Sequence, residues 1–558
     1  MKSALTSVVV AIVHVGIALG VDAPKAAEYI WPSASDFLES QLYEQVGNDI
    51  TSIAQFVVPC GTTPLATGRN INAEWVRTVY HDVATADVVA GTGGVDASIG
   101  FEMDRPENAG PVAFNETLQF LRGSLTAQSS MADLLTIGLI TSIGSCSAGK
   151  VIVPFRGGRI DATGAGPSGV PKPDETIESH TAAFKRMGLN RDEMIGLIAC
   201  GHTMGGVHGK DFPEIVDKPA SGPDDHDRTQ DFDTTGSGTS SFDNKIATEF
   251  VANVTQNPLA FGKNDTTNSD KRIFNSDGRK AITKLASSPD VFFQTCQTLL
   301  EKMVNIVPKT VTLASSPLHP IDVKPGRLFG QINDNKTMTL SGNIRLREPS
   351  IGPNPDRTVK IQFRPRGSTQ TCAQSKACLS AAVTADEGSW TASQYEPIAF
   401  KRYPFSVKVG LSRGVSSFEV VVSDKQDNGK IKTTTYTNGG AGFPFDDTLL
   451  TQPKLSCAEQ NSKGALTLTV AVRDDAKLSS LKGSIQMPSS LTALVPKVQT
   501  KALTFSKTTG VAGSGYTFYK ASHTDMPGTY TRTYNLVASD GKKTVQKLFQ
   551  DFSGLDSC

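Results

Sequence analysis

The sequence predicts a multidomain protein with an all-α half followed by an all-β half of antiparallel, sandwich-like modules. Apolar residues recur at helical spacing up to about residue 308. Prolines then interrupt residues 307–320, and beyond them short stretches alternate between apolar and polar residues. A chain of 558 residues is too long for one core. We therefore expect a helical domain at 24–308, a β module at 309–455 and a second β module at 456–558.

Residues 1–23 have the pattern of a secretory signal peptide, with Lys2 before an apolar run and small residues near its end. A membrane anchor is the alternative, but the run is too short to favour one. We expect the mature protein to be extracellular and not bound to a membrane. The formal net charge is zero, so the overall charge gives no reason to expect a nucleic-acid partner.

The helical half contains a series of stretches with period 3.6. They are residues 35–45, 73–82, 115–123, 130–143, 176–187, 192–202, 242–254, 279–286 and 290–304. Asn72 is a candidate cap for the second stretch. Asn190 and Glu193 form a capping-box pattern before residues 192–202.

The β half contains alternating stretches at residues 337–340, 359–363, 418–422 and 466–472, separated by turn residues. Its aromatic residues admit two interpretations, a face that stacks on sugars or the core of a sandwich. They include Trp390, Tyr395, Phe400, Tyr403 and Phe405.

Two helices carry the residues that suggest chemistry. Arg77 and His81 are four residues apart, so a helix places a cation and a base on one face. His202 ends a second, apolar helix and is followed by small residues. The first helix would present its pair to one face of a cofactor, and the second would present a histidine ligand to the other face. Taken singly, each histidine is better interpreted as part of a core.

These motifs resemble the haem peroxidase superfamily of plants, fungi and bacteria, over roughly residues 40–308. The resemblance rests on an Arg-x-x-aromatic-His motif ending at His81, a Gly-x-Asp-x-Ser segment from Gly94 to Ser98, and the later histidine His202. Glu102 and Asn108 match a pair six residues apart in the family. The closest features are those of secreted fungal members, with some of the cytochrome c peroxidase-like class. Tyr80 departs from the family, which usually has Phe or Trp there.

The resemblance implies haem b as cofactor, with His202 as the iron ligand. In the distal motif it implies that His81 takes a proton from hydrogen peroxide, that Arg77 stabilises developing negative charge, and that Asn108 orients His81. Further cofactor-binding residues follow from the resemblance. They are Asp277 as the carboxylate beside His202, Pro154 near the haem edge, Phe232 in place of a tryptophan, and His208 near a propionate. The alternatives are a helix N-cap for Asp277 and an ordinary surface histidine for His208.

The resemblance also implies one or two bound cations. Asp82, the carbonyl of Gly94, Asp96 and Ser98 match a distal calcium site made of oxygen ligands. Thr203, Asp233, Thr235 and Asp243 match a second site for calcium or potassium. The alternative for both groups is a solvated polar loop.

Eight cysteines are consistent with disulfides in a secreted protein. The resemblance implies a bond between Cys60 and Cys146, and we expect the further pairs Cys200–Cys296, Cys372–Cys378 and Cys457–Cys558. Other pairings stay open, because connectivity does not follow from sequence. Asn115, Asn253, Asn264 and Asn335 begin glycosylation sequons in a eukaryotic host.

The expected function is that of a secreted haem peroxidase, which reduces hydrogen peroxide and oxidises a small-molecule or aromatic donor in one-electron steps. Asn70 and Ala73 stand where manganese-oxidising relatives have glutamates, so a standard manganese site is not expected. The alternative is a wall- or carbohydrate-binding protein with an inactive peroxidase-like domain. In either case cell-wall polysaccharide is a candidate partner of the β half.

Overall fold

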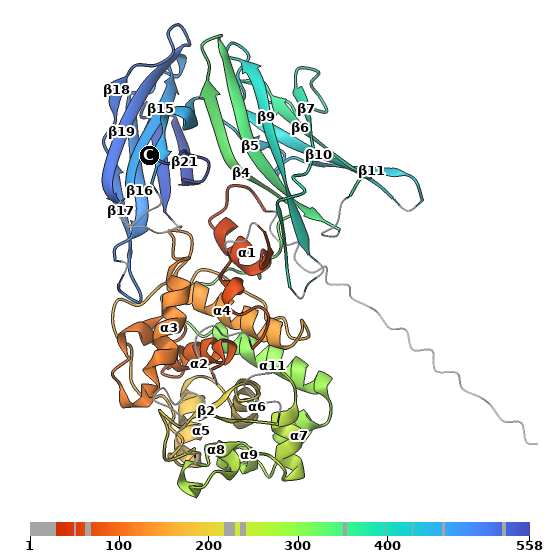
Figure 1. Ribbon diagram of the computed structural model, residues 1–558, viewed down its shortest axis with the longest axis vertical. Helices are drawn as coiled ribbons and strands as arrows, with labels where there is room; N and C mark the ends of the chain where they lie inside the picture. Colours follow the sequence, from red (N-terminus) through yellow and green to blue (C-terminus); the bar gives the residue numbers. More distant parts are fainter. Residues whose placement is uncertain are drawn as a thin grey trace, which may run out of the picture.

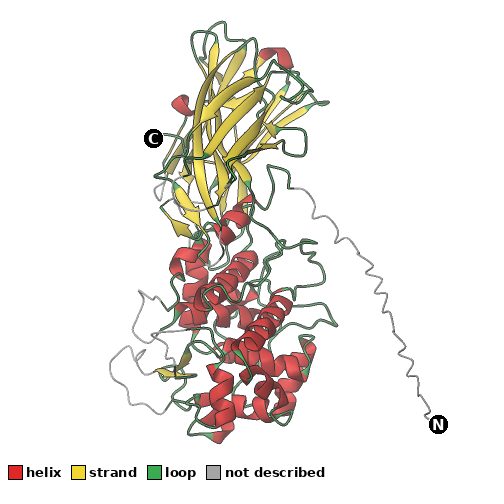
Figure 2. Ribbon diagram, turned by 90° about the vertical axis from the view of Figure 1, so that its right-hand side faces the viewer, coloured by secondary structure: helices red, strands yellow, loops and turns green. Residues whose placement is uncertain are grey.

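The computed structural model describes residues 29–48, 52–61, 69–216, 229–234, 241–349, 354–394, 396, 398–426, 428–459, 464–490, 492–526 and 532–558. The expected signal peptide, Thr235 and Tyr395 lie outside these residues. Helices occupy one end of an elongated molecule and strands occupy the other (Figure 1, Figure 2). Among the described residues, every helix is too short or too polar to cross a membrane.

Each helical stretch expected from the sequence contains a helix. The helices are α1 (Asp36–Tyr43), α2 (Ile71–Val83), α3 (Pro111–Arg122), α4 (Met131–Cys146), α5 (Ile177–Arg186), α6 (Arg191–Gly201), α7 (Lys245–Ala252), α8 (Pro258–Phe261), α9 (Ser269–Asn275), α10 (Lys280–Ala286) and α11 (Pro289–Val304). The capping box of Asn190 and Glu193 is present. The cap of α2 is Asn70 rather than Asn72, whose amide instead donates to the carbonyl of Val57. Helices α8 and α9 were not expected from the sequence.

The position of α2 depends on close packing against α4. The buried ring of Trp75 lies over Gly138, where an added Cβ would come within 2.8 Å of the ring. The close approach that glycine allows fixes the helix that carries Arg77 and His81.

The first β module is a sandwich of two antiparallel sheets. One sheet has the order β1-β8-β9-β5-β4, and the other has the order β11-β10-β6-β7 with β12 beside β10. The strands are β1 (Val46–Gly47), β4 (Val323–Ile332), β5 (Thr337–Glu348), β6 (Arg357–Arg364), β7 (Leu379–Val383), β8 (Trp390–Ala392), β9 (Ala399–Gly410), β10 (Ser417–Lys425), β11 (Ile431–Tyr436) and β12 (Phe443–Pro444). Phe400, Tyr403 and Phe405 are buried, so these aromatic residues belong to the protein interior. Binding of polysaccharide by this half stays a prediction.

The second β module is also a sandwich. One sheet has the order β13-β15-β19-β18 with β14 beside β15, and the other has the order β17-β16-β20-β21. The strands are β13 (Leu449–Thr451), β14 (Cys457–Ala458), β15 (Gly464–Arg473), β16 (Ser480–Pro488), β17 (Val498–Leu503), β18 (Ser506–Thr508), β19 (Tyr516–Met526), β20 (Thr533–Ser539) and β21 (Thr544–Asp551). Strand β13 pairs with β15 of this module, and the boundary at residue 456 stays a prediction. A short ribbon in the helical half pairs β2 (Gly206–His208) with β3 (Thr229–Asp231).

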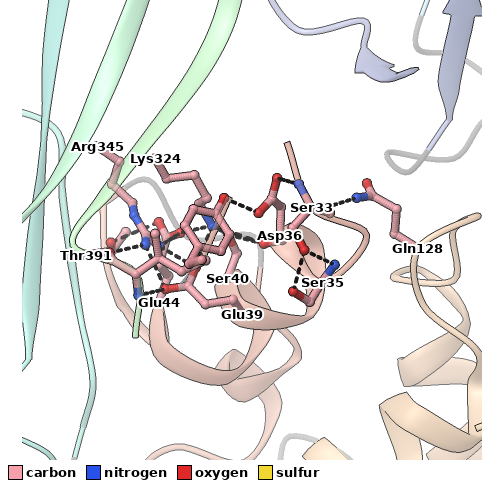
Figure 3. A network of polar contacts seen from close by, with 12 residues as sticks. Ser33, Ser35, Asp36, Glu39, Ser40, Glu44, Gln128, Lys324, Arg345 and Thr391 are labelled. Carbon is pink, nitrogen blue, oxygen red and sulfur yellow. Dashed lines mark hydrogen bonds and ion pairs between the residues drawn. The ribbon is translucent and has the colours of Figure 1, made fainter. Parts of the chain in front are cut away.

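Helix α1 joins the two halves of the molecule (Figure 1). Its Leu38 and Leu42 belong to the core of the helical half. Glu39 of α1 and Glu44, the residue directly after its end, face the first β module, where Arg345 of β5 forms an ion pair of 2.7 Å with each of them (Figure 3). The chain then adds β1 to the edge of β8. The N-terminal segment is therefore shared by the helical and β halves.

The four expected disulfides are all present. They join Cys60–Cys146, Cys200–Cys296, Cys372–Cys378 and Cys457–Cys558. The first two cross-link the helical half, and the last fastens the C-terminal end to β14.

Candidate active site

A cavity of about 650 Å³ lies in the helical half, and Arg77, His81 and His202 all line it. Its size falls within the range of roughly 300–1,000 Å³ that is usual for small-molecule and cofactor sites. Helix α2 contributes Arg77 and His81, and His202 directly follows α6. The structure thus brings together the two histidine motifs, which are far apart in the sequence.

His81 is held by an amide. The side chain of Asn108 donates from its Nδ2 to the carbonyl of Glu102 at 2.9 Å, which leaves its Oδ1 to accept from His81 Nδ1 at 2.9 Å. This places the proton of a neutral imidazole on Nδ1 and leaves the lone pair on Nε2. Burial lowers the pKa of His81 well below its usual value, and the positive charge of Arg77 lowers it further. The ring is therefore a neutral base at pH 7.

Arg77 is fixed beside this base. Its guanidinium donates to the carbonyl of Ala109 at 2.6 Å and lies over the ring of Phe114, 4.4 Å from the centroid. Loss of hydration lowers the pKa of Arg77 to about 10, so it stays charged near neutral pH. The ring of Phe114 also packs against His81, with centroids 4.7 Å apart. Phe114 is a site residue that the sequence motifs did not indicate.

The carboxylate beside His202 is Asp270, not Asp277. The Nδ1 of His202 lies 2.9 Å from the Oδ2 of Asp270, which is fully buried and also accepts from the amide of Asn257 at 2.7 Å. The prediction for Asp277 was wrong, because its carboxylate accepts the backbone N–H groups of Lys280 and Ala281 at the start of α10. With Nδ1 donating to a carboxylate, His202 keeps Nε2 as the nitrogen available to a metal.

The other expected cofactor contacts have mixed outcomes. Phe232 stacks on the ring of His202, with centroids 4.5 Å apart and planes 13° from parallel, and His208 lines the cavity. Pro154 is not among the described residues that line it. The chain after Pro154 instead lines a second, larger cleft between the helical and β halves, through Phe155 and residues 157–163.

The cavity fits a haem group bound through His202. The fit rests on the donor set, a histidine with one free ring nitrogen and a buried carboxylate behind it, in a space of cofactor size. His81 and Arg77 line the same space and leave a basic nitrogen and a cation for chemistry there.

The expected distal cation ligands are close together in the structure. The carboxylate of Asp82 accepts the N–H groups of Asp96, Ala97 and Ile99 at 2.8–3.0 Å. Burial raises the pKa values of Asp82 and Asp96, and the charge of Asp96 raises that of Asp82 further. Gly94 lies against the carbonyl of Ile306, where a Cβ would come within 2.6 Å. Two buried carboxylates at one place suit a cation, and calcium here stays a prediction.

The second expected cation site is only partly described. The hydroxyl of Thr203 donates to the carbonyl of Asp243 at 2.5 Å. Asp233, two residues after the end of β3, is buried. Thr235 lies outside the described residues. In the described part of the chain, there is no group of three or more His, Cys, Asp and Glu side chains placed to hold a metal ion. Each expected set has only two acidic members, so the prediction of calcium or potassium is left open.

Residues 62–288 match the peroxidase family. The helical half belongs to the haem peroxidase superfamily. The matched range of this peroxidase domain includes Arg77, His81, Asn108, His202 and Asp270.

Relatives of the peroxidase domain include L-ascorbate peroxidase 5, peroxisomal, of Arabidopsis thaliana, which is 33% identical over 149 residues covering 26% of this chain and 51% of the relative. Catalase-peroxidase 1 of Haloarcula marismortui is 45% identical over 60 residues, which are 10% of this chain and 8% of the relative.

A longer match is with a WSC domain-containing protein of Arthroderma benhamiae, 37% identical over 397 residues. It covers 70% of this chain and 52% of the relative. Since 70% of the chain is more than the part that precedes β4, this similarity extends into the β half. The chain spans about half the length of the WSC domain-containing protein and of the ascorbate peroxidase.

Proposed function

We propose that this protein is a secreted haem peroxidase that reduces hydrogen peroxide and oxidises donors in one-electron steps. The observation that carries the proposal is the pairing of two oriented histidines in one cavity, His81 with a basic Nε2 and His202 with a carboxylate behind it. Haem, when bound, supplies the electrons that reduce peroxide. The signal-peptide pattern supports secretion.

The side chains of this chain perform the proton transfers. His81 accepts a proton from hydrogen peroxide at Nε2 and returns it to the departing oxygen, and Asn108 keeps the other nitrogen protonated throughout. Arg77 offers a fixed cation to the negative charge that develops as the O–O bond breaks. His202 would hold the iron, and Asp270 gives its ring partial anionic character, which favours an oxidised metal.

A visible spectrum of haem-supplied, purified protein tests this function. We expect a Soret band that changes rapidly after one equivalent of hydrogen peroxide. His202→Ala should weaken haem retention, and His81→Leu should slow the change by about 10²–10⁴-fold. The exposed His319 provides a matched control, since His319→Leu should change neither property.

Two results would contradict the proposal. One is a folded wild-type protein that takes up no haem. The other is a His81→Leu variant that reacts with peroxide as fast as the wild type, because His81 would then not be the base.

A further inference from the structure

His180 is a buried histidine with no role in the mechanism above. It lies near the start of α5, lines the same cavity as His81 and His202, and is only 3% exposed. Neither of its ring nitrogens has a hydrogen-bond partner among the residues that the structure describes. Buried polar groups nearly always have a partner, so a ring left unpaired in a cavity wall indicates that the contents of the cavity supply one.

The ring and its surroundings favour a neutral ligand. Burial lowers the pKa of His180, so at pH 7 one ring nitrogen donates a hydrogen bond and the other accepts one. A hydroxyl group can donate a hydrogen bond to the unprotonated ring nitrogen or accept one from the protonated nitrogen, whereas a carboxylate can only accept. Three carboxylates and one guanidinium act on the ring, an excess of negative charge that disfavours an anion. They belong to Glu175, Asp270, Asp174 and Arg272.

The cavity that His180 lines also has apolar walls that suit an aromatic ring. Phe184, one helical turn further along α5, lines the cavity together with Pro171 and Pro173. The ring of Tyr80 lies 6.3 Å from that of Phe184, measured between centroids. Flat apolar surfaces beside a single polar group are typical of sites that bind small aromatic molecules.

We propose that His180 binds the hydroxyl group of a phenolic reducing substrate and accepts its proton when that substrate is oxidised. This inference rests on the proposed peroxidase function. The phenol gives one electron to the haem group that hydrogen peroxide has oxidised. Its O–H bond breaks, the proton passes to the unprotonated nitrogen of His180, and a phenoxyl radical leaves. Glu175 and Asp270 stabilise the imidazolium that forms.

Binding to the resting protein tests the contact without turnover. Phenol and anisole, its methyl ether, are titrated into the full-length, haem-loaded protein without peroxide, and binding is followed by the change in the visible spectrum. We expect phenol to bind about tenfold more tightly than anisole, which corresponds to one buried hydrogen bond. His180→Phe should remove this preference, and the control His319→Phe should keep it.

Turnover then tests the proton transfer. The rate of phenol oxidation is divided by that of ferrocyanide, a donor that loses an electron and no proton. We expect this ratio to fall at least tenfold in His180→Phe and also in His180→Gln, whose amide can hydrogen-bond but is not a base. His180→Gln keeps the test decisive if the phenylalanine variant does not take up haem.

Equal affinity for phenol and anisole in the wild type, or an unchanged ratio in both variants, would overturn the role of His180. Failure of the wild type to oxidise either donor with peroxide would instead overturn the peroxidase function itself.

Discussion

Asp270 lies beside His202 because α9 carries it there, whereas Asp277 lies beyond the end of that helix. Both acidic residues occur in one polar stretch, and their side chains differ in what surrounds them. Ile273 and Phe274, three and four residues after Asp270, are almost completely buried, so Asp270 shares the inward face of α9. That spacing is the signal in the sequence that would have identified the carboxylate.

Replacing the two aspartates separately distinguishes their roles. Asp270→Asn should raise the reduction potential of the bound haem, because an amide makes His202 less electron-donating than a carboxylate does. Asp277→Asn should leave the potential unchanged, since an asparagine caps a helix as well as an aspartate. Spectroelectrochemical titration of both variants measures the difference. Equal potentials in the two variants would show that Asp270 does not tune the metal.

The sequence did not predict the short helices α8 and α9. Long apolar stretches such as those of α4 and α11 have enough turns for their period to be recognised. The four residues of α8 and the seven of α9 span one or two turns, and their helical state depends on packing against the rest of the domain. The distal motif on α2 was predictable for the opposite reason, because thirteen residues of one helix hold Arg77 and His81 on one face.

Helix α1 should make the junction between the helical and β halves sensitive to acid. Burial alone would raise the pKa values of Glu39 and Glu44, but the charges of Arg345 and Lys324 outweigh it and hold both values below the usual 4.5. A carboxylate with a lowered pKa in the folded state contributes stability above its unfolded pKa and loses it as the pH falls. The free energy of unfolding should therefore decrease below about pH 4.5.

Denaturant unfolding at a series of pH values checks this expectation. Glu39→Gln should lower the free energy of unfolding by about 3–5 kcal/mol at pH 7, because the buried Arg345 loses the negative charge of one of its two carboxylate partners. It should also make the free energy of unfolding less dependent on pH in acid. The exposed pair of Asp265 and Lys271 is the control, and Asp265→Asn should change nothing measurable. A Glu39→Gln profile parallel to that of the wild type would show that these ion pairs do not cause the acid sensitivity.

The helical and β halves of the molecule are separate in the sequence, but they pack against each other and share core residues. The change of pattern near residue 310 marks where helices give way to strands, as α11 ends at Val304 and β4 begins at Val323. Sequence patterns are local, so they did not show that α1 and β1 return to the β half. Ile398 and Phe400 of the β half even belong to the core of the peroxidase domain.

The peroxidase domain alone should therefore be unstable. A chain of residues 24–308 lacks Arg345 and Lys324, so Glu39 and Glu44 would lose their partners, and Leu38 and Leu42 would lose part of their cover. We expect this fragment to aggregate or to unfold at a much lower temperature than the full chain, as measured by circular dichroism. A fragment as stable as the full chain would show that the contacts of α1 with the β half contribute little.

The same helix sets an order of assembly during synthesis. The hydroxyl of Thr391 donates to Glu44, 347 residues earlier in the chain. At about 5–20 residues per second, the ribosome needs roughly 20–70 seconds to make that interval. This contact of the N-terminal segment can therefore form only after most of the chain has been made, later than the ion pairs of Glu39 and Glu44 with Lys324 and Arg345.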